Sequence, residues 1–471
     1  MNIKSNLFII LFLQVLFLAC KTTDKALDTA PTLPEHFRNA ETVKADSSGI
    51  ALIAWRDFFS DATLQGLIDT AILHNMDMQL AVKNIEAAQL TLKQAKAEYL
   101  PDLNLQVTAN TSRPSDNSMN GLSLNEFLES KHIEDYTAAL SLSWEADIWG
   151  KIKNQKTAAL ASYLQTTEAK KAVQTQLVSS VAQGYYNLLM LQMQLKIAQQ
   201  NLALNDSTLN IIKQQYDVGD ITQLGLEQAE AQRLAAASLI PEFEQQINIQ
   251  ENALSILSGK LPETIATATT LAEINIPQEV NTGIPSLLLS QRPDVKQAEL
   301  AITVAQADKQ YARANMYPSL TISAQAGVNA FKASNWFNMP ASLFGTAIGG
   351  ITQPLLQRKQ LKTRYKLAAI DQEKTIIQFR QSVITAVGEV SDALIALKKL
   401  EEKQTIARNR TNKLQHAIHN ADLLFDTGMA NYLEVITAQS SVLQSELELA
   451  QIKKAQLVAV VDLYRSLGGG W

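Results

Sequence analysis

Cysteine is almost absent from this 471-residue sequence, and its scarcity limits the chemistry available to the chain. A single cysteine, Cys20, rules out a disulfide within the chain and any metal site built from cysteines. Long apolar runs are also missing: beyond the N-terminal region, no segment reaches the roughly eighteen apolar residues of a membrane-spanning helix. Any membrane crossing by the rest of the chain must therefore use another kind of structure.

The sequence lacks a strong charge of either sign and any motif for catalysis. The 41 Lys and Arg against 46 Asp and Glu give a net charge of −5, and no basic block typical of nucleic-acid binding stands out. A Ser-His-Asp set, a glycine-rich phosphate loop and a His-Glu-x-x-His motif are all missing. His416 and His419 lie three positions apart, but without a third ligand nearby an exposed helix face explains them better. We therefore expect no enzyme, cofactor, metal site or nucleic-acid partner.

The one cysteine stands at the end of a targeting segment. An apolar run over residues 7–18 is too short to span a bilayer and is typical of a signal peptide. It ends in Leu16-Phe17-Leu18-Ala19-Cys20, which resembles the cleavage site of bacterial lipoproteins. We expect a signal peptide at residues 1–19, lipidation of Cys20 and a polar tether at residues 20–50. The alternative is a plain secretory signal with an incidental cysteine.

Two parts of the chain repeat one another. Residues 75–103 return 217 positions later as residues 292–320, with the same Asp, Ala-Gln and Ala-x-Ala-x-x-x-Pro-x-Leu at matched places. Tyr216-Asp217-Val218-Gly219 returns 209 positions later as Phe425-Asp426-Thr427-Gly428. A duplicated unit of about 210 residues predicts one symmetric architecture instead of unrelated domains.

Each repeat contains a long stretch without proline. We place the first repeat at residues 51–270 and the second at residues 271–471. The stretches are rich in Ala, Leu, Gln, Lys and Glu, the residues that form helices most readily. Residues 155–218 and 359–424 are each predicted to form one helix, and at about 1.5 Å per residue the first would span about 96 Å. Such helices need partners packed alongside them.

Four shorter segments alternate apolar and polar residues with the period of a β-strand. They lie at residues 102–112, 136–148, 319–330 and 341–354. Each is near the roughly nine to eleven residues that a tilted strand needs to cross a bilayer. Four strands cannot lie in lipid alone, because their edges would be unpaired, nor close a barrel with a usable interior. Three chains sharing one barrel would supply twelve strands. The alternative is two soluble β-hairpins on a helical bundle.

A set of motifs in this order resembles the TolC-like outer-membrane efflux-channel family, and most of all its lipoprotein branch serving tripartite pumps. The motifs are Trp55-Arg56-Asp57-Phe58-Phe59, Trp144 to Lys151, Gly283 to Leu288 with Gln291-Arg292-Pro293-Asp294, and Leu467-Gly468-Gly469-Gly470-Trp471. The resemblance covers nearly the whole mature chain. It implies a mainly α trimer, whose twelve-stranded β-barrel in the outer membrane continues as a twelve-helix α-barrel through the periplasm. Residues 357–359 depart from the family, which usually has glycine there, and leave the geometry of that turn open.

The resemblance also implies a function and its partners. The trimer would be a passive exit duct for drugs or metal ions, lipid-anchored in the outer membrane and extending into the periplasm. A periplasmic adaptor would open it and an inner-membrane pump would drive transport. The docking tip, where the adaptor binds, would consist of Val218, Gly219, Thr427 and Gly428. The gate acids, around the periplasmic constriction, would be Asp217, Asp220, Asp426 and Glu434.

The gate acids and the function both have alternatives. A ring of carboxylates favours cations, but Asp217 and Asp426 could instead only cap or solvate helix ends. The same kind of tube also serves as the duct for type I protein secretion. A periplasmic coiled-coil scaffold without a pore is a different class of function that fits the helices. The lipoprotein site and the terminal Gly-Gly-Gly-Trp favour small-molecule efflux, while the cargo itself cannot be read because the pump selects it.

Overall fold

The computed structural model describes residues 32–38, 53–128, 130–275 and 284–471. Cys20, the expected signal peptide and all of the expected tether except residues 32–38 lie outside the described residues. Residues 33–471 form one compact unit, and it is this unit that is described below. Within the described ranges, no helix combines the length and the apolar character that a membrane crossing would need.

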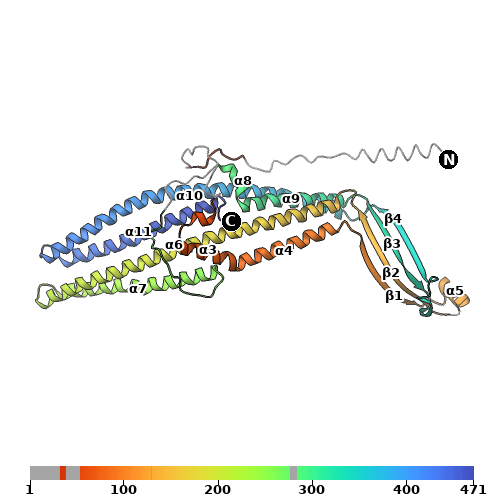
Figure 1. The fold of residues 1–471 in the computed structure, drawn as a ribbon, viewed down its shortest axis with the longest axis horizontal. Coiled ribbons are helices and arrows are strands. Elements are labelled where there is room, and N and C mark those ends of the chain that lie inside the picture. Colours follow the sequence, from red (N-terminus) through yellow and green to blue (C-terminus); the bar gives the residue numbers. More distant parts are fainter. Residues whose placement is uncertain (1–31, 39–52, 129, 276–283) are drawn as a thin grey trace. The chain divides into compact units, whose positions relative to one another are not determined.

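The two halves of this unit contain helices and strands in the same order (Figure 1). The first half comprises α2 (Trp55–Phe58), α3 (Ala62–His74), α4 (Met76–Ala97), β1 (Asp102–Ser112), α5 (Met119–Leu128), β2 (Ile133–Ala146), α6 (Lys151–Asp217) and α7 (Gln223–Leu257). The second comprises η2 (Pro285–Leu287), α8 (Leu288–Gln291), α9 (Pro293–Ala314), β3 (Ser319–Ala330), η3 (Ala333–Asn335), β4 (Leu343–Thr352), α10 (Gln360–Asp426) and α11 (Tyr432–Ser466). The short 3-10 helices η2 and η3 stand in the second half where α2 and α5 stand in the first. The long helices, α6 and α10, have 67 residues each, and the helices that follow them, α7 and α11, here called the return helices, have 35 each.

The four strands form one antiparallel sheet in the order β1-β2-β3-β4. Leu103, Leu105 and Val107 lie on one face of β1 and are 63%, 72% and 60% exposed, so this face carries apolar side chains without a cover in the single chain. Antiparallel pairing brings the start of β1, the end of β2, the start of β3 and the end of β4 to one end of the sheet. At this end, here called the junction, α4 and α9 lead into β1 and β3, and β2 and β4 lead into α6 and α10.

Two strands end differently from the sequence prediction. β2 covers Ile133–Ala146 where residues 136–148 were predicted, because the side chain of Asp147 turns to the next helix. Its two carboxylate oxygens accept hydrogen bonds from the backbone N–H groups of Ile152 and Lys153, at 3.0 and 2.9 Å. β4 covers Leu343–Thr352, inside the predicted residues 341–354, and stops before Pro354, which has no N–H to donate to a ladder.

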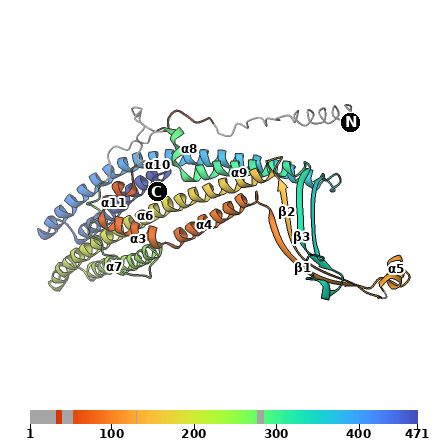
Figure 2. The ribbon, with the colours of Figure 1, turned by 45° about the vertical axis from the view of Figure 1, so that its right-hand side comes forward.

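The helices pack side by side around three apolar cores, the smallest of which lies at the ends of the long hairpins (Figure 2). One core lies where α3, α6 and α7 meet and includes Ile68, Tyr185 and Leu254, all fully buried. The aromatic ring of Phe58 stacks on that of Tyr464 at 4.0 Å and ties α2 to α11. A second core joins α8, α9, α10 and the end of α11. These contacts supply the lateral partners that helices of this length require.

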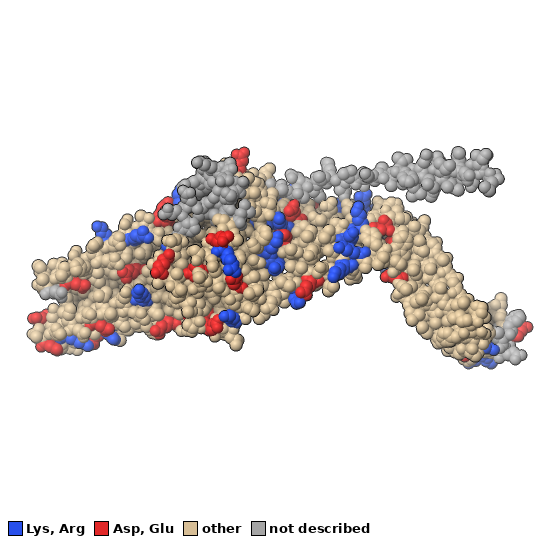
Figure 3. Space-filling view, viewed as in Figure 1, with Lys and Arg blue, Asp and Glu red and all other residues tan. Residues whose placement is uncertain are grey.

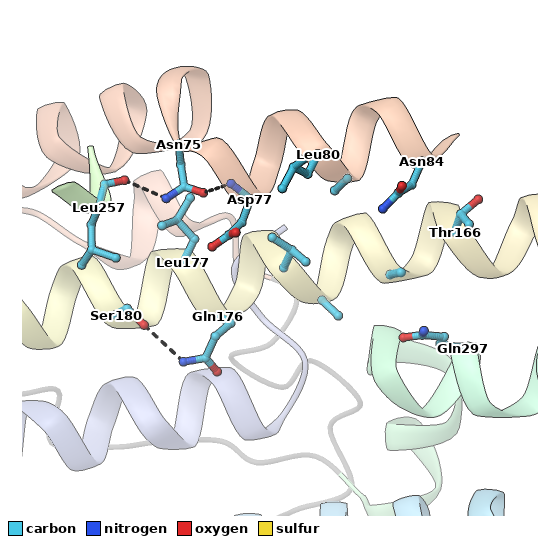
Figure 4. A pocket seen from close by; sticks show the side chains of 14 residues that line it. Asn75, Asp77, Leu80, Asn84, Thr166, Gln176, Leu177, Ser180, Leu257 and Gln297 are labelled. Atoms are coloured by element: carbon cyan, nitrogen blue, oxygen red, sulfur yellow. Dashed lines mark hydrogen bonds between the residues drawn. The ribbon is translucent and has the colours of Figure 1, made fainter. Parts of the chain in front are cut away.

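In each repeat, one side chain joins the start of the 22-residue helix, α4 or α9, to the end of the return helix, and this contact is here called the closure. Asn75, the N-cap of α4, accepts a hydrogen bond from the N–H of Asp77 and donates its Nδ2 to the carbonyl of Leu257, the last residue of α7, at 3.0 Å (Figure 4). At the position of Asn75 plus 217 stands Arg292, the N-cap of α9. Its Nη1 donates to the carbonyl of Ser466, the last residue of α11, at 3.0 Å. The N-cap residue of α4 or α9 therefore hydrogen-bonds the end of the return helix in both halves.

Glycines complete these two closures. Gly259 follows α7 with φ of 67° and Gly468 follows α11 with φ of 96°, a conformation that favours glycine. A Cβ on Gly259 would lie 2.2 Å from the carbonyl oxygen of His74, and one on Gly468 would lie 2.7 Å from that of Gln291. The return helices approach the α3 and α8 ends so closely that no side chain fits between them.

Candidate functional site

The two long hairpins end in turns of one design. In each, the N–H of the turn glycine, Gly219 or Gly428, donates to the carbonyl three residues earlier at 3.0 Å. The N–H of the next residue donates to the carbonyl five residues earlier, at 2.8 Å in both turns. This pair of bonds is the Schellman motif, which reverses the chain at a left-handed residue, and φ is 85° at Gly219 and 72° at Gly428.

The docking tip is open to solvent in the single chain. A Cβ added to Gly219 or Gly428 would meet no atom within 4 Å. Val218 is 73% exposed, Thr427 is exposed, and Met429 beside them is 72% exposed. The turns thus present backbone and apolar side chains that no other described residue covers, which is the composition of a contact surface.

Three of the gate acids can be placed in full. Asp217 is the last residue of α6, and Asp220 lies just beyond the glycine of the same turn; both are exposed, and among the described residues neither forms an ion pair. Asp426 ends α10, but its side chain lies outside the described part. A carboxylate at a helix C-terminus cannot cap it, because the free groups there are carbonyls. Capping of α6 therefore does not explain Asp217, and simple solvation of the helix end stays the alternative to the gate role.

Glu434 has a local partner, Asn431, that was not predicted from the sequence. Asn431 Oδ1 accepts from the N–H of Leu433 at 3.0 Å and from that of Glu434 at 3.2 Å, while Glu434 Oε2 accepts from the N–H of Asn431 at 3.2 Å. This reciprocal arrangement is a capping box and starts α11. Asn-x-x-Glu before an apolar run was the readable signal. Glu434 is exposed, so its carboxylate reaches solvent as well.

The two turns are held together by apolar packing and one hydrogen bond. Ile212, Phe425 and Val435 are buried where the hairpin ends meet. The hydroxyl of Tyr432 donates to Gln228 Oε1 at 2.9 Å, which links α11 to α7. The position of Glu434 minus 209 is Gly225, where a Cβ would come within 3.0 Å of the Tyr432 ring. The gate acids of the two turns thus belong to one packed end of the unit, and only the second turn carries the capping glutamate.

A second feature of the helical layer is a groove that lies away from the two turns (Figure 4). It has a volume of about 620 Å³ and lies between α4 and α6, with Gln297 of α9 at one side. Leu80, Leu177 and Val173 give it a mainly apolar lining, and Asp77 and Asn84 stand along its α4 wall. Among the described residues no group of three His, Cys, Asp or Glu side chains is suited to hold a metal.

A family model described as "Outer membrane efflux protein" matches residues 67–260 and 284–469, one segment in each repeat. The two segments together cover well over half of the chain. The chain belongs to the outer membrane efflux protein family.

Curated relatives align along most of the chain. The cation efflux system protein CusC of Escherichia coli O6:H1 is 29% identical over 421 residues, covering 88% of each protein. The pyoverdine export outer membrane protein OpmQ of Pseudomonas aeruginosa is 28% identical over 454 residues, covering 96% of this chain and 94% of OpmQ. The protein is therefore an outer-membrane component of an efflux system.

Solved structures agree with this assignment. CusC superposes with a TM-score of 0.80 at 26% identity, covering 94% of this chain and 99% of that one. The CmeC outer membrane channel of Campylobacter jejuni shares the fold, with a TM-score of 0.84 at 22% identity over 94% of this chain. The predicted TolC-like fold, with long helices and membrane strands, is confirmed.

Proposed function

We propose that the protein is the passive exit duct of a tripartite efflux machine and catalyses no reaction. Three copies would form the duct, a periplasmic adaptor would open it, and an inner-membrane pump would drive transport. The observation that carries the proposal is the open four-stranded sheet. In the described chain, β1 and β4 are paired on one side only, and their outer edges leave backbone groups free.

Closure between subunits would satisfy these edges. If β4 of one subunit pairs with β1 of the next, three chains form a twelve-stranded barrel without an edge, as lipid requires. The apolar face of β1, with Leu103, Leu105 and Val107, would then meet lipid. The groove between α4 and α6 would receive helices of the adjoining subunit, which its apolar lining suits. The long helices would continue the barrel as a twelve-helix tube.

The remaining assignments follow from this assembly. Threefold symmetry would gather three copies of each gate acid at the periplasmic end, where their charge would favour cations. Lipidation of Cys20 would add a second attachment to the outer membrane. The relatives export different cargoes, cations for CusC and pyoverdine for OpmQ, on similar chains. We therefore assign the choice of cargo to the pump.

Blocking the docking tip tests the adaptor contact. Histidine tolerates the left-handed conformation better than most residues, and nothing within 4 Å opposes a Cβ at Gly219 or Gly428. The double variant Gly219→His/Gly428→His should abolish pump-dependent resistance in cells that supply the cognate adaptor and pump. Its trimers should still assemble. Gly388 is an open glycine near the middle of α10, away from the docking tip. Gly388→His is therefore the matched control and should keep resistance.

The tip result separates two roles. Normal resistance in the double variant would place adaptor docking elsewhere. Loss of the trimer itself, with the control intact, would assign Gly219 and Gly428 to folding instead.

Two substitutions separate the gate role of Glu434 from its capping role. Glutamine can replace glutamate in a capping box, so Glu434→Gln removes the charge and keeps the α11 start, whereas Glu434→Ala removes both. If Glu434 lines the gate, Glu434→Gln should lower the cation-over-anion permeability ratio of channels reconstituted in planar bilayers. Unchanged selectivity in Glu434→Gln, with loss of stability only in Glu434→Ala, would leave this residue as a cap alone.

A further inference from the structure

A dense group of cations follows the last strand. From Gln357 to Lys366, five of ten residues are basic and none is acidic. These five, here called the basic collar, are Arg358, Lys359, Lys362, Arg364 and Lys366. All are exposed, and in the described part of the chain none of them forms an ion pair or a side-chain hydrogen bond. Figure 3 shows Lys and Arg gathered where the helices meet the sheet. Apolar and amide residues interrupt this group, so it does not stand out as a basic block in the sequence.

The collar is unfavourable for the isolated chain in two respects. It covers the two residues before α10 and the first two turns of that helix, where the positive end of the helix dipole repels cations. In addition, Arg358 and Lys359 are left-handed, with φ of 49° and 63°. The position of Lys359 minus 209 is Gly150, which has φ of 71° and caps α6 at no such strain. The turn that the family makes with glycine is thus kept here with two charged residues, which indicates that their charge has a use.

The surroundings of the collar have the composition of a membrane interface. Leu355 and Leu356, directly before it, are 85% and 96% exposed. The rings of Trp149 and Tyr317, from the ends of the neighbouring strands, stack at 4.9 Å. Aromatic residues of this kind mark the headgroup level of membrane strands. The collar therefore lies just beyond that level, on the helical side of the junction.

We propose that the basic collar binds the phosphates of anionic glycerophospholipids in the leaflet that faces the helices. Leu355 and Leu356 would enter the adjoining acyl region, while the five cations remain at the headgroups. This inference rests on the proposed membrane assembly. Polybasic segments next to a membrane gain affinity for anionic lipid with each added Lys or Arg. Lipid phosphate would offset the repulsion between the collar and the helix dipole. It would also give Arg358 and Lys359, which adopt the left-handed backbone conformation, an anionic partner.

A neighbouring subunit is a poorer partner for the collar. In the proposed barrel the next β1 edge adjoins β4, and it would bring residues 93–102 close to the start of α10. That segment carries Lys93 and Lys96 against Glu98 and Asp102, and so has no net charge to offer. Glu98 is moreover already bonded by Gln155 at 2.8 Å. Five cations need more anionic groups than this edge provides.

The test compares two triple variants on one helix. Lys362→Gln/Arg364→Gln/Lys366→Gln removes three collar charges from ordinary helical positions. Lys398→Gln/Arg408→Gln/Lys413→Gln removes the same residue types from exposed positions farther along α10. Each full-length protein is purified in detergent and titrated with phosphatidylglycerol or phosphatidylcholine, and bound lipids are counted by native mass spectrometry.

The wild type and the control should prefer phosphatidylglycerol, and the collar variant should lose roughly tenfold or more of that preference, given the gain per cation expected at anionic surfaces. Trimer content should be equal in all three. An unchanged preference in the collar variant would overturn the proposal. So would trimer loss confined to that variant, which would make the collar a subunit contact, or full competition by inorganic phosphate, which would make it a site for soluble anions. Failure of the proposed assembly would show differently, as an absence of trimers in the wild type.

Discussion

Replacing Arg292 with methionine is expected to lower the free energy of unfolding by about 2 kcal/mol, because it removes a buried cation that hydrogen-bonds the partly exposed carboxylates of Asp294 and Glu389. The Arg292 side chain is 6% exposed and its Nη1 lies 2.8 Å from Glu389 Oε2. Its Nη2 and Nε donate to the two oxygens of Asp294 at 2.6 and 3.0 Å. Since Arg292 also holds the carbonyl of Ser466, the variant should loosen the end of α11 as well.

A matched exposed pair provides the control. Arg56 donates to both carboxylate oxygens of Asp69, at 2.5 and 2.6 Å, but its side chain is 59% exposed. Exposed pairs contribute about 0–1 kcal/mol, so Arg56→Met should shift the urea midpoint only slightly. Equal shifts for Arg56→Met and Arg292→Met would show that burial adds nothing, and would contradict the account of this closure.

The effect of Arg292→Met should also depend on pH. Burial raises the pKa of Asp294, but the hydrogen bonds and charge of Arg292 outweigh it and hold this pKa below its usual value. A carboxyl with a lowered folded pKa contributes stability above its unfolded pKa, about 3.9, and loses it as the pH falls through the folded value. The gap between wild type and variant in urea should therefore be wide at neutral pH and narrow below about pH 4.

Alanine at either closure glycine is the second large effect we expect. A left-handed Cβ alone costs about 1–2 kcal/mol, and the contacts of 2.2 Å to His74 and 2.7 Å to Gln291 would add a backbone displacement. Gly259→Ala and Gly468→Ala should each lose at least about 3 kcal/mol or fail to assemble. The measurement is the denaturation midpoint of the purified proteins.

Gly388→Ala is the control for both closure glycines. This glycine lies inside α10 with open space around it, so alanine should be neutral or should stabilise by up to about 1 kcal/mol. Destabilisation of Gly388→Ala as large as that of Gly259→Ala would mean that any added methyl is harmful. The close approach of the return helices would then not be the reason.

Regular features of the sequence predicted most of the fold. The proline-free stretches predicted the long helices because propensity and length acted in one direction over dozens of residues. Alternation located the strands, but the end of β2 depended on whether Asp147 continued the strand or capped α6, and the capping bonds prevailed. Both closures depend on partners about 180 residues apart, as for Asn75 and Leu257, and no local pattern reveals such contacts.

At the candidate site, what could be predicted varied with the residue. The glycine turns were readable because a left-handed residue ends each helix. The capping box of Glu434 was readable too, as Asn431-x-x-Glu434, but the resemblance directed attention to the gate instead. The geometry of the turn at residues 357–359 could not be predicted, because glycine is missing there. The structure shows that Arg358 and Lys359 adopt the left-handed conformation in its place. Rings of gate acids require neighbouring subunits and remain a prediction.

The central claim is that three chains close one continuous duct. Electron microscopy of the detergent-purified protein tests it most directly, because the particle shape needs no assumption about cargo, adaptor or pump. The account predicts threefold particles with an open bore, and the 67 residues of α6 alone, at about 1.5 Å each, require a length of roughly 100 Å or more. Compact monomers or solid rods would contradict it, and the strands would then belong to a periplasmic scaffold without a pore.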